Sequence, residues 1–255
     1  MHTKTLGLVS ISILAASLAG AASAFGDAGT GFQHYVEHEF PEAISACAKS
    51  TDITSRLVLA LSHSERYAIF KNKADKTQAQ SLLKELHAEI TLEDSGILAK
   101  FLNVPGNAQG NAEAFDLLAA AMKKSESTPA HVLAMASFVD STYGLAVNKL
   151  AIDTITDRLA PVRQYVSKGG TMPKEMQKEV FTSDQLLTAM IGALEQEKLA
   201  AAAEKCLVAI EEPALAQLES RPRSEAISEA IAEIRKAIAK RQEKFPTSTW
   251  FSAVG

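Results

Sequence analysis

One alanine recurs along this chain at nearly constant spacing. The recurring residues are Ala43, Ala79, Ala114, Ala146 and Ala202, and the gaps between them are 36, 35, 32 and 56 residues. Each is followed four residues later by a small or apolar residue; in chain order these are Cys47, Leu83, Leu118, Leu150 and Cys206. Most other apolar residues also recur at intervals of three and four, which places them on one face of a helix.

This spacing has a physical explanation in pairs of helices. Two antiparallel helices and their turns occupy roughly 34 residues, and a small residue fits where the second helix crosses the first closely. The pattern therefore predicts an all-α chain of stacked helix pairs. The last, longer gap leaves room for an extra helix between Pro161 and Phe181.

The most complete unit is the segment GFQHYVEHEFPEAISACAKS at 31–50. It resembles the tetratricopeptide repeat (TPR) family, which places a glycine where Gly31 stands and aromatic residues where Tyr35 and Phe40 stand. The run Glu42-Ala43-Ile44 also resembles that family.

A second segment, 192–213, is similar to the same family and ends in a proline, whereas the middle units depart from the pattern because Lys76 and Asn111 replace the aromatic residue. The resemblance spans residues 30–213 with an interruption. It implies a right-handed superhelical solenoid of antiparallel helix pairs. Sel1-like or HEAT-like repeats are the second architecture we consider, and an ordinary helical bundle is the third.

Short signals predict individual helix boundaries. Thr128-Pro129 is typical of an N-cap followed by a first-turn proline. Thr182-x-x-Gln185 matches a capping box, and Pro41 fits the first turn of a helix that begins at Phe40.

The chain's first 24 residues match a secretory signal peptide. Lys4 is followed by an apolar stretch at residues 6–18 and by Ala22-Ser23-Ala24, an A-x-A cleavage site. The apolar stretch is too short for a convincing membrane span. We expect cleavage near Ala24 and an exported mature protein, periplasmic or secreted.

Residues 221–245 predict an amphipathic helix, with apolar residues at Ile227, Ile231, Ile234 and Ile238. A solenoid needs a terminal helix with a polar outer face, so we expect this helix to be a cap. The predicted domains are a signal peptide at 1–24, a repeat domain at 25–213, a capping region at 214–245 and an extended tail at 246–255 that contains Trp250.

Charge excludes one class of partner. Without the signal peptide the chain has 25 basic and 30 acidic side chains, and no basic stripe. Binding to nucleic acid depends on a basic face, so no nucleic-acid partner is expected. The mature chain contains no stretch of 18 apolar residues, so no membrane span is expected there.

Cys47 and Cys206 occupy core positions of distant units, and we expect both thiols to be buried and reduced.

The stretch HYVEH, residues 34–38, matches the H-x-x-E-H signature of the inverse zincins. His34 and His38 would share a helix face only if the helix continued through both. The repeat pattern instead places His38 in a turn and Pro41 in the next helix. We therefore expect a helix end, with no catalytic residue and no cofactor. A secreted zinc-dependent hydrolase that uses His34 and His38 is the alternative.

The family resemblance also implies a function. Stacked helix pairs form a concave face that binds a peptide or a helix of a partner protein. The groove positions carried over from the family are Phe32, Tyr35, Lys71, Asn72, Met135, Phe138, Ile191 and Glu195. Because most of these are apolar, the expected partner is an apolar or helical protein segment. The predicted function is a non-enzymatic protein–protein interaction scaffold or adaptor.

Overall fold

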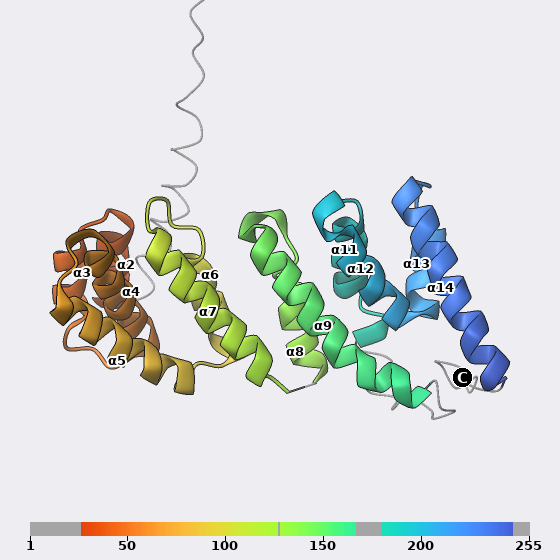
Figure 1. Cartoon of the computed structure of the whole chain (residues 1–255), viewed down its shortest axis with the longest axis horizontal. Coiled ribbons are helices and arrows are strands. Elements are labelled where there is room, and N and C mark those ends of the chain that lie inside the picture. The colour runs from red at the N-terminus through yellow and green to blue at the C-terminus, as the bar shows by residue number, and fades with distance from the viewer. Residues whose placement is uncertain (1–26, 127, 167–179, 247–255) are drawn as a thin grey trace, which may run out of the picture. The chain divides into compact units, whose positions relative to one another are not determined.

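The computed structural model describes residues 27–126, 128–166 and 180–246 (Figure 1). The predicted signal peptide at 1–24, the tail beyond Pro246 with Trp250, and most of the predicted extra helix lie outside these residues. Throughout the described ranges the chain forms helices and no strands, which confirms the all-α prediction.

The chain divides into two compact units between Ala121 and Met122. The sequence had predicted one repeat domain over 25–213 and gave no sign of a division at this point. Unit 1 comprises the residues up to Ala121, and unit 2 begins at Met122.

Unit 1 is built from consecutive helices joined by short turns. Helix α2 packs against α3, both contact α4, and α4 packs along α5. A 3-10 turn, η1, leads into a short helix, α6, and α7 begins in unit 1 and ends just past the division. The bounds are α2 Asp27–Val36, α3 Phe40–Cys47, α4 Ile53–Phe70, α5 Lys73–Glu89, η1 Leu92–Asp94, α6 Ser95–Phe101 and α7 Ala108–Lys124 (Figure 1).

Unit 2 is also built from helices that pack against one another. Helix α8 packs against α9, and α12 contacts α9, α11 and α14; α13 packs against α14. The bounds are α8 Pro129–Ala136, η2 Ser141–Tyr143, α9 Leu145–Val166, α11 Asp184–Leu194, α12 Glu197–Ile210, α13 Glu212–Glu219 and α14 Glu225–Lys244 (Figure 1).

Only the first three of the five recurring alanines lie in the core. Each of the five alanines lies in a different helix, in turn α3, α5, α7, α9 and α12. The first three are buried, whereas Ala146 is exposed and Ala202 is half-buried. In α12 the neighbouring Ala203 is fully buried and lies one turn before Cys206, so the predicted register of that helix is wrong by one residue.

Helix boundaries confirm some local signals and correct others. The Thr128 hydroxyl accepts a hydrogen bond from the His131 amide at 3.3 Å, and Pro129 opens α8 as predicted. The predicted capping box at Thr182 is wrong, because Ser183 caps α11 instead and accepts from the Leu186 amide.

Pro161 was expected at the start of an extra helix, but it lies inside α9. A proline ring removes one helical hydrogen bond, which frees the carbonyl four residues earlier. Pro161 is exposed, so water can reach that part of the helix. This exposure explains how α9 continues through the proline.

Helix α14 has the predicted amphipathic pattern. Ile227, Ile231 and Ile234 are buried against α12 and α13, and Ile238 is half-buried. Ser224 caps the helix through a hydrogen bond from the Ile227 amide at 3.2 Å. Within the described residues, no helix has both the length and the apolar character that a membrane crossing requires.

Candidate functional site

The apolar residues predicted to line a partner groove lie inside the two units. Tyr35 and Met135 are fully buried, and Phe32, Phe138 and Ile191 are nearly so. Tyr35, for example, packs edge-on against the rings of Phe40 and Phe101, at centroid distances of 5.9 and 5.5 Å. A partner could reach none of the five without displacing core side chains.

The polar members of the predicted set are exposed, and two of them lie together. Lys71 ends α4 in the left-handed conformation, with φ of 56°, and Asn72 caps α5 by accepting a hydrogen bond from the Ala74 amide at 2.9 Å. Glu195 ends α11 in unit 2 and is also exposed. Lys71 and Asn72 therefore form the turn that joins α4 to α5.

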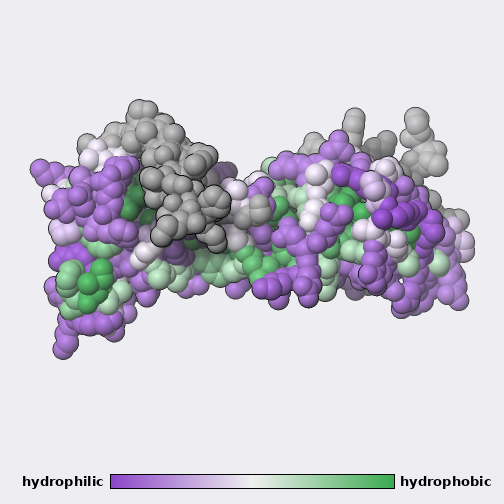
Figure 2. Space-filling model, turned by 90° about the horizontal axis from the view of Figure 1, so that it is seen from above, coloured by the Kyte–Doolittle hydropathy of each residue, from purple (hydrophilic) through white to green (hydrophobic). Residues whose placement is uncertain are grey.

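The two residues before that turn were not predicted from the sequence. On the face shown in Figure 2, hydrophilic residues cover most of the described surface, with smaller hydrophobic areas between them. Ile69 is 57% exposed and Phe70 is 69% exposed, the highest values for large apolar side chains among the described residues. Hydropathy alone assigns both to the core, and only their position at the end of α4 could have indicated otherwise. We call Ile69, Phe70, Lys71 and Asn72 the α4–α5 tip.

Polar contacts behind the α4–α5 tip hold its two helices together. The buried carboxylate of Asp75 on α5 lies 2.7 Å from His63 Nδ1 and 3.5 Å from the Arg66 guanidinium, both on α4. The ammonium groups of Lys71 and Lys76 each lie 5.5 Å from the centre of the Tyr67 ring. A cation at this distance is attracted to the ring face. The tip is thus a fixed surface that combines apolar and cationic groups.

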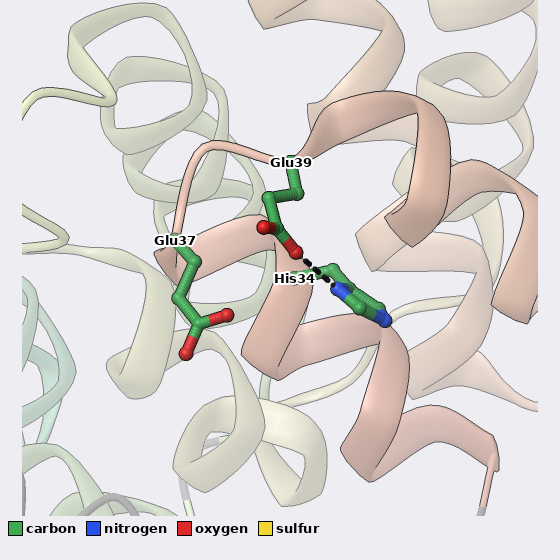
Figure 3. Close-up of side chains that lie close together, drawn as sticks. All are labelled: His34, Glu37 and Glu39. Carbon is green, nitrogen blue, oxygen red and sulfur yellow. Dashed lines mark hydrogen bonds and ion pairs between the residues drawn. The ribbon is translucent and has the colours of Figure 1, made fainter.

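The histidines of HYVEH do not converge on one point. His34 is on α2, and its Nδ1 lies 2.7 Å from a carboxylate oxygen of Glu39, with Glu37 beside them (Figure 3). Candidate ligand atoms of these three residues lie within 4.8 Å of one another. His38 is not part of this group, because it lies in the turn with φ of 64° and its ring packs on Phe40 at 5.9 Å. The group is largely exposed, and exposed acidic groups are common in proteins that bind no ion there.

Glu65 is a buried acidic residue on α4, two positions after His63. Its carboxylate is buried and accepts a hydrogen bond from the Gly110 amide at 2.6 Å, in the first turn of α7. Burial raises the pKa of Glu65, although hydrogen bonds from the Gly110 and Gln109 amides oppose the shift. Glu65 and His63 therefore have different partners, because His63 contacts Asp75.

Comparison with protein-family models, with curated proteins and with solved structures gives no match for this chain.

Proposed function

We propose that the mature chain is an exported, non-enzymatic protein–protein interaction scaffold, built of TPR-like helix pairs, which binds a partner protein through the α4–α5 tip. The export part of this proposal depends on the sequence of residues 1–24, and the repeat part on the recurring alanines. The observation that supports partner binding is the exposure of Ile69 and Phe70 directly before the Lys71-Asn72 turn.

Exposed apolar residues are common one at a time, so exposure alone does not indicate a binding site. At the α4–α5 tip, however, two large apolar side chains are adjacent and Lys71 follows them directly, with Lys76 at the same Tyr67 ring as Lys71. Apolar anchors surrounded by a polar rim are typical of protein interfaces. The contacts of Asp75 with His63 and Arg66 also hold α4 against α5 behind the tip, which reduces the loss of backbone entropy when a partner binds.

The chemistry of the tip indicates the chemistry of its partner. Ile69 and Phe70 would bury against apolar side chains, and Lys71 and Lys76 would pair with acidic ones. The partner segment that fits best is a helix or extended peptide with apolar residues flanked by Asp or Glu. Such a segment agrees with the apolar or helical partner expected from the sequence, with an acidic flank added.

A photo-crosslinking amino acid placed at position 73, which is exposed next to the α4–α5 tip, tests this proposal in the cells that export the protein. We expect one crosslinked partner of defined mass, and about tenfold or greater loss of its capture in an Ile69→Ser, Phe70→Ser variant. Leu145→Ser is the matched control, because Leu145 is also an exposed large apolar residue but lies on α9 in unit 2. Equal loss in both variants, or no saturable capture by the natural chain, would contradict the proposal.

Two further measurements on the same material test the other parts. Mass spectrometry of the exported protein should find an N-terminus near Phe25. Metal analysis tests the zinc-hydrolase alternative, which has the His34, Glu37 and Glu39 group as its structural support. Stoichiometric zinc that is lost in a His34→Ala variant would overturn the non-enzymatic proposal.

A further inference from the structure

A pocket of about 630 Å³ lies between α9, α12 and α14 in unit 2. Its apolar part is made by Ala160, Ala209, Ala237 and Phe245. Volumes of roughly 300–1,000 Å³ are usual for sites that bind small molecules. The small alanine side chains leave open the space that larger residues would fill.

The charged residues that line this pocket are almost all basic. Lys205 comes from α12, Lys240 and Lys244 from α14, and Arg163 from α9. The formal net charge of the whole chain is −4, so a group of cations at one place is not a consequence of composition. We call these four residues the basic rim.

The one acidic residue among the described lining residues, Glu211, already forms ion pairs. Glu211 is buried, and its carboxylate lies 2.7 Å from the Arg241 guanidinium and 3.4 Å from that of Arg163. Arg241 also forms an ion pair with Glu212. Glu211 therefore offsets the charge of the buried Arg241 and part of the charge of Arg163. It does not offset the charges of the three rim lysines.

Lys205, Lys240 and Lys244 form no ion pair within the part of the chain that the structure describes. Lys240 and Lys244 are four residues apart on α14, a spacing at which like charges repel on a helix surface. A position in the last helical turn, where the dipole favours cations, accounts for Lys244. It does not account for Lys205, which lies outside the last turn of α12.

We propose that this pocket binds a small anionic amphiphile, with its acidic group at the basic rim and its apolar group against the alanines and Phe245. A phosphate monoester fits best, because lysine ammonium groups bind phosphate oxygens as point charges and a dianion offsets more than one of them. The same chemistry occurs in a free phosphorylated metabolite and in the headgroup of an anionic lipid. This site lies in unit 2 and does not depend on partner binding at the α4–α5 tip.

Isothermal titration calorimetry of the mature chain with hexyl phosphate, at low salt, tests the proposal. We expect one saturable site whose affinity is about tenfold or more above that for inorganic phosphate or for hexanol. The affinity should fall with added salt because the rim charges are exposed. Affinities for hexyl phosphate and inorganic phosphate that are equal, or no binding of hexyl phosphate, would overturn the proposal.

Matched variants locate the binding. Lys205→Gln with Lys240→Gln should weaken hexyl phosphate binding by about tenfold or more. Lys198→Gln with Lys236→Gln removes the same charges from the same two helices outside the pocket, and should leave the affinity unchanged. Equal weakening in both variants would indicate a nonspecific charge effect and reject the site.

A second arm separates the two sources of the ligand. Vesicles of phosphatidylcholine with phosphatidic acid should bind the natural chain and not the Lys205, Lys240 variant if the ligand is a lipid headgroup. Binding of hexyl phosphate without binding of these vesicles assigns a free metabolite. Vesicle binding that is unchanged by the rim variant would show a membrane attraction unrelated to the pocket and would exclude the lipid source.

Discussion

The carboxylate of Glu211 and the guanidinium of Arg241 meet at 2.7 Å, although the two residues are 30 positions apart in the chain. Both side chains are almost completely buried. Their contact joins the turn between α12 and α13 to the end of α14, and it forms one wall of the pocket in unit 2.

Arg241→Ala should destabilise unit 2 strongly, because it leaves the Glu211 carboxylate buried without its closest cation. Loss of one partner of a buried ion pair typically costs about 3–5 kcal/mol. A Glu211→Leu, Arg241→Leu double variant should lose clearly less, since it removes both charges. Hydrogen exchange of the amides in α12 and α14 reports on unit 2 alone. An Arg241→Ala loss no larger than that of the double variant would contradict this account.

Gly31→Ala should destabilise unit 1. A methyl group on Gly31 would lie 2.2 Å from the Sγ atom of Cys47, so α2 and α3 would have to separate. Overpacking of this kind costs about 1–3 kcal/mol. Cys47→Ala removes the clashing sulfur, so the double variant should recover part of the loss in a double-mutant cycle of urea unfolding.

Gly96→Ala provides the control for that experiment. A methyl group on Gly96, in α6 of the same unit, would have no atom within 4 Å. Alanine favours the helix over glycine by up to about 1 kcal/mol, so this variant should be neutral or more stable. If both glycine variants lost the same stability, the Gly31–Cys47 contact would not be the cause.

Sequence patterns predicted features that depend on a few neighbouring residues. The proline at the start of α3, the Thr128 cap and the isoleucine face of α14 are of this kind. The register of α12 was missed because five consecutive residues from Leu199 to Ala203 are small or apolar, and periodicity alone cannot choose among them.

The candidate sites were less predictable from the sequence than the helices. The family resemblance named Tyr35 and Phe138 as groove residues, and both are buried, because an aromatic residue in a helix fits a core as well as a groove. Ile69 and Phe70 are exposed because α4 ends with them, a boundary set by the left-handed Lys71 rather than by hydropathy. The basic rim combines residues from three helices, and no local pattern brings them together.

The stability of unit 1 should depend on pH through Glu65. Burial raises the pKa of Glu65 in the folded chain, so the folded state holds its proton more tightly than the unfolded state does. The stabilising contribution is therefore fully present below the unfolded pKa of about 4.3 and is lost as the pH rises through the raised folded pKa. Glu65→Gln keeps an oxygen acceptor for the Gly110 amide and removes the titration.

The measurement for Glu65 is urea unfolding of both proteins between pH 4 and pH 7. The free energy of unfolding of the natural chain should fall relative to that of Glu65→Gln as the pH rises. Gln78→Glu is a useful control, because residue 78 is exposed on α5 and a carboxyl group there should titrate normally. A difference between natural chain and Glu65→Gln that stays constant with pH would show that the folded pKa of Glu65 is not raised.

Cys206 should resist alkylation in the folded chain. Burial raises the pKa of the Cys206 thiol to about 12, with a hydrogen bond to Thr156 acting in the opposite direction. The thiolate is the reactive form, and an unperturbed thiol has a pKa of about 8.5. Below about pH 8.5 the contribution of the protonated Cys206 thiol to stability is fully present, and it is lost as the pH rises towards 12.

Iodoacetamide at pH 8.5, followed by peptide mass spectrometry, should label Cys206 slowly in buffer and rapidly in urea. Rapid labelling of the folded chain, or recovery of a disulfide between Cys47 and Cys206, would contradict the structure, in which both cysteines are buried and form no disulfide.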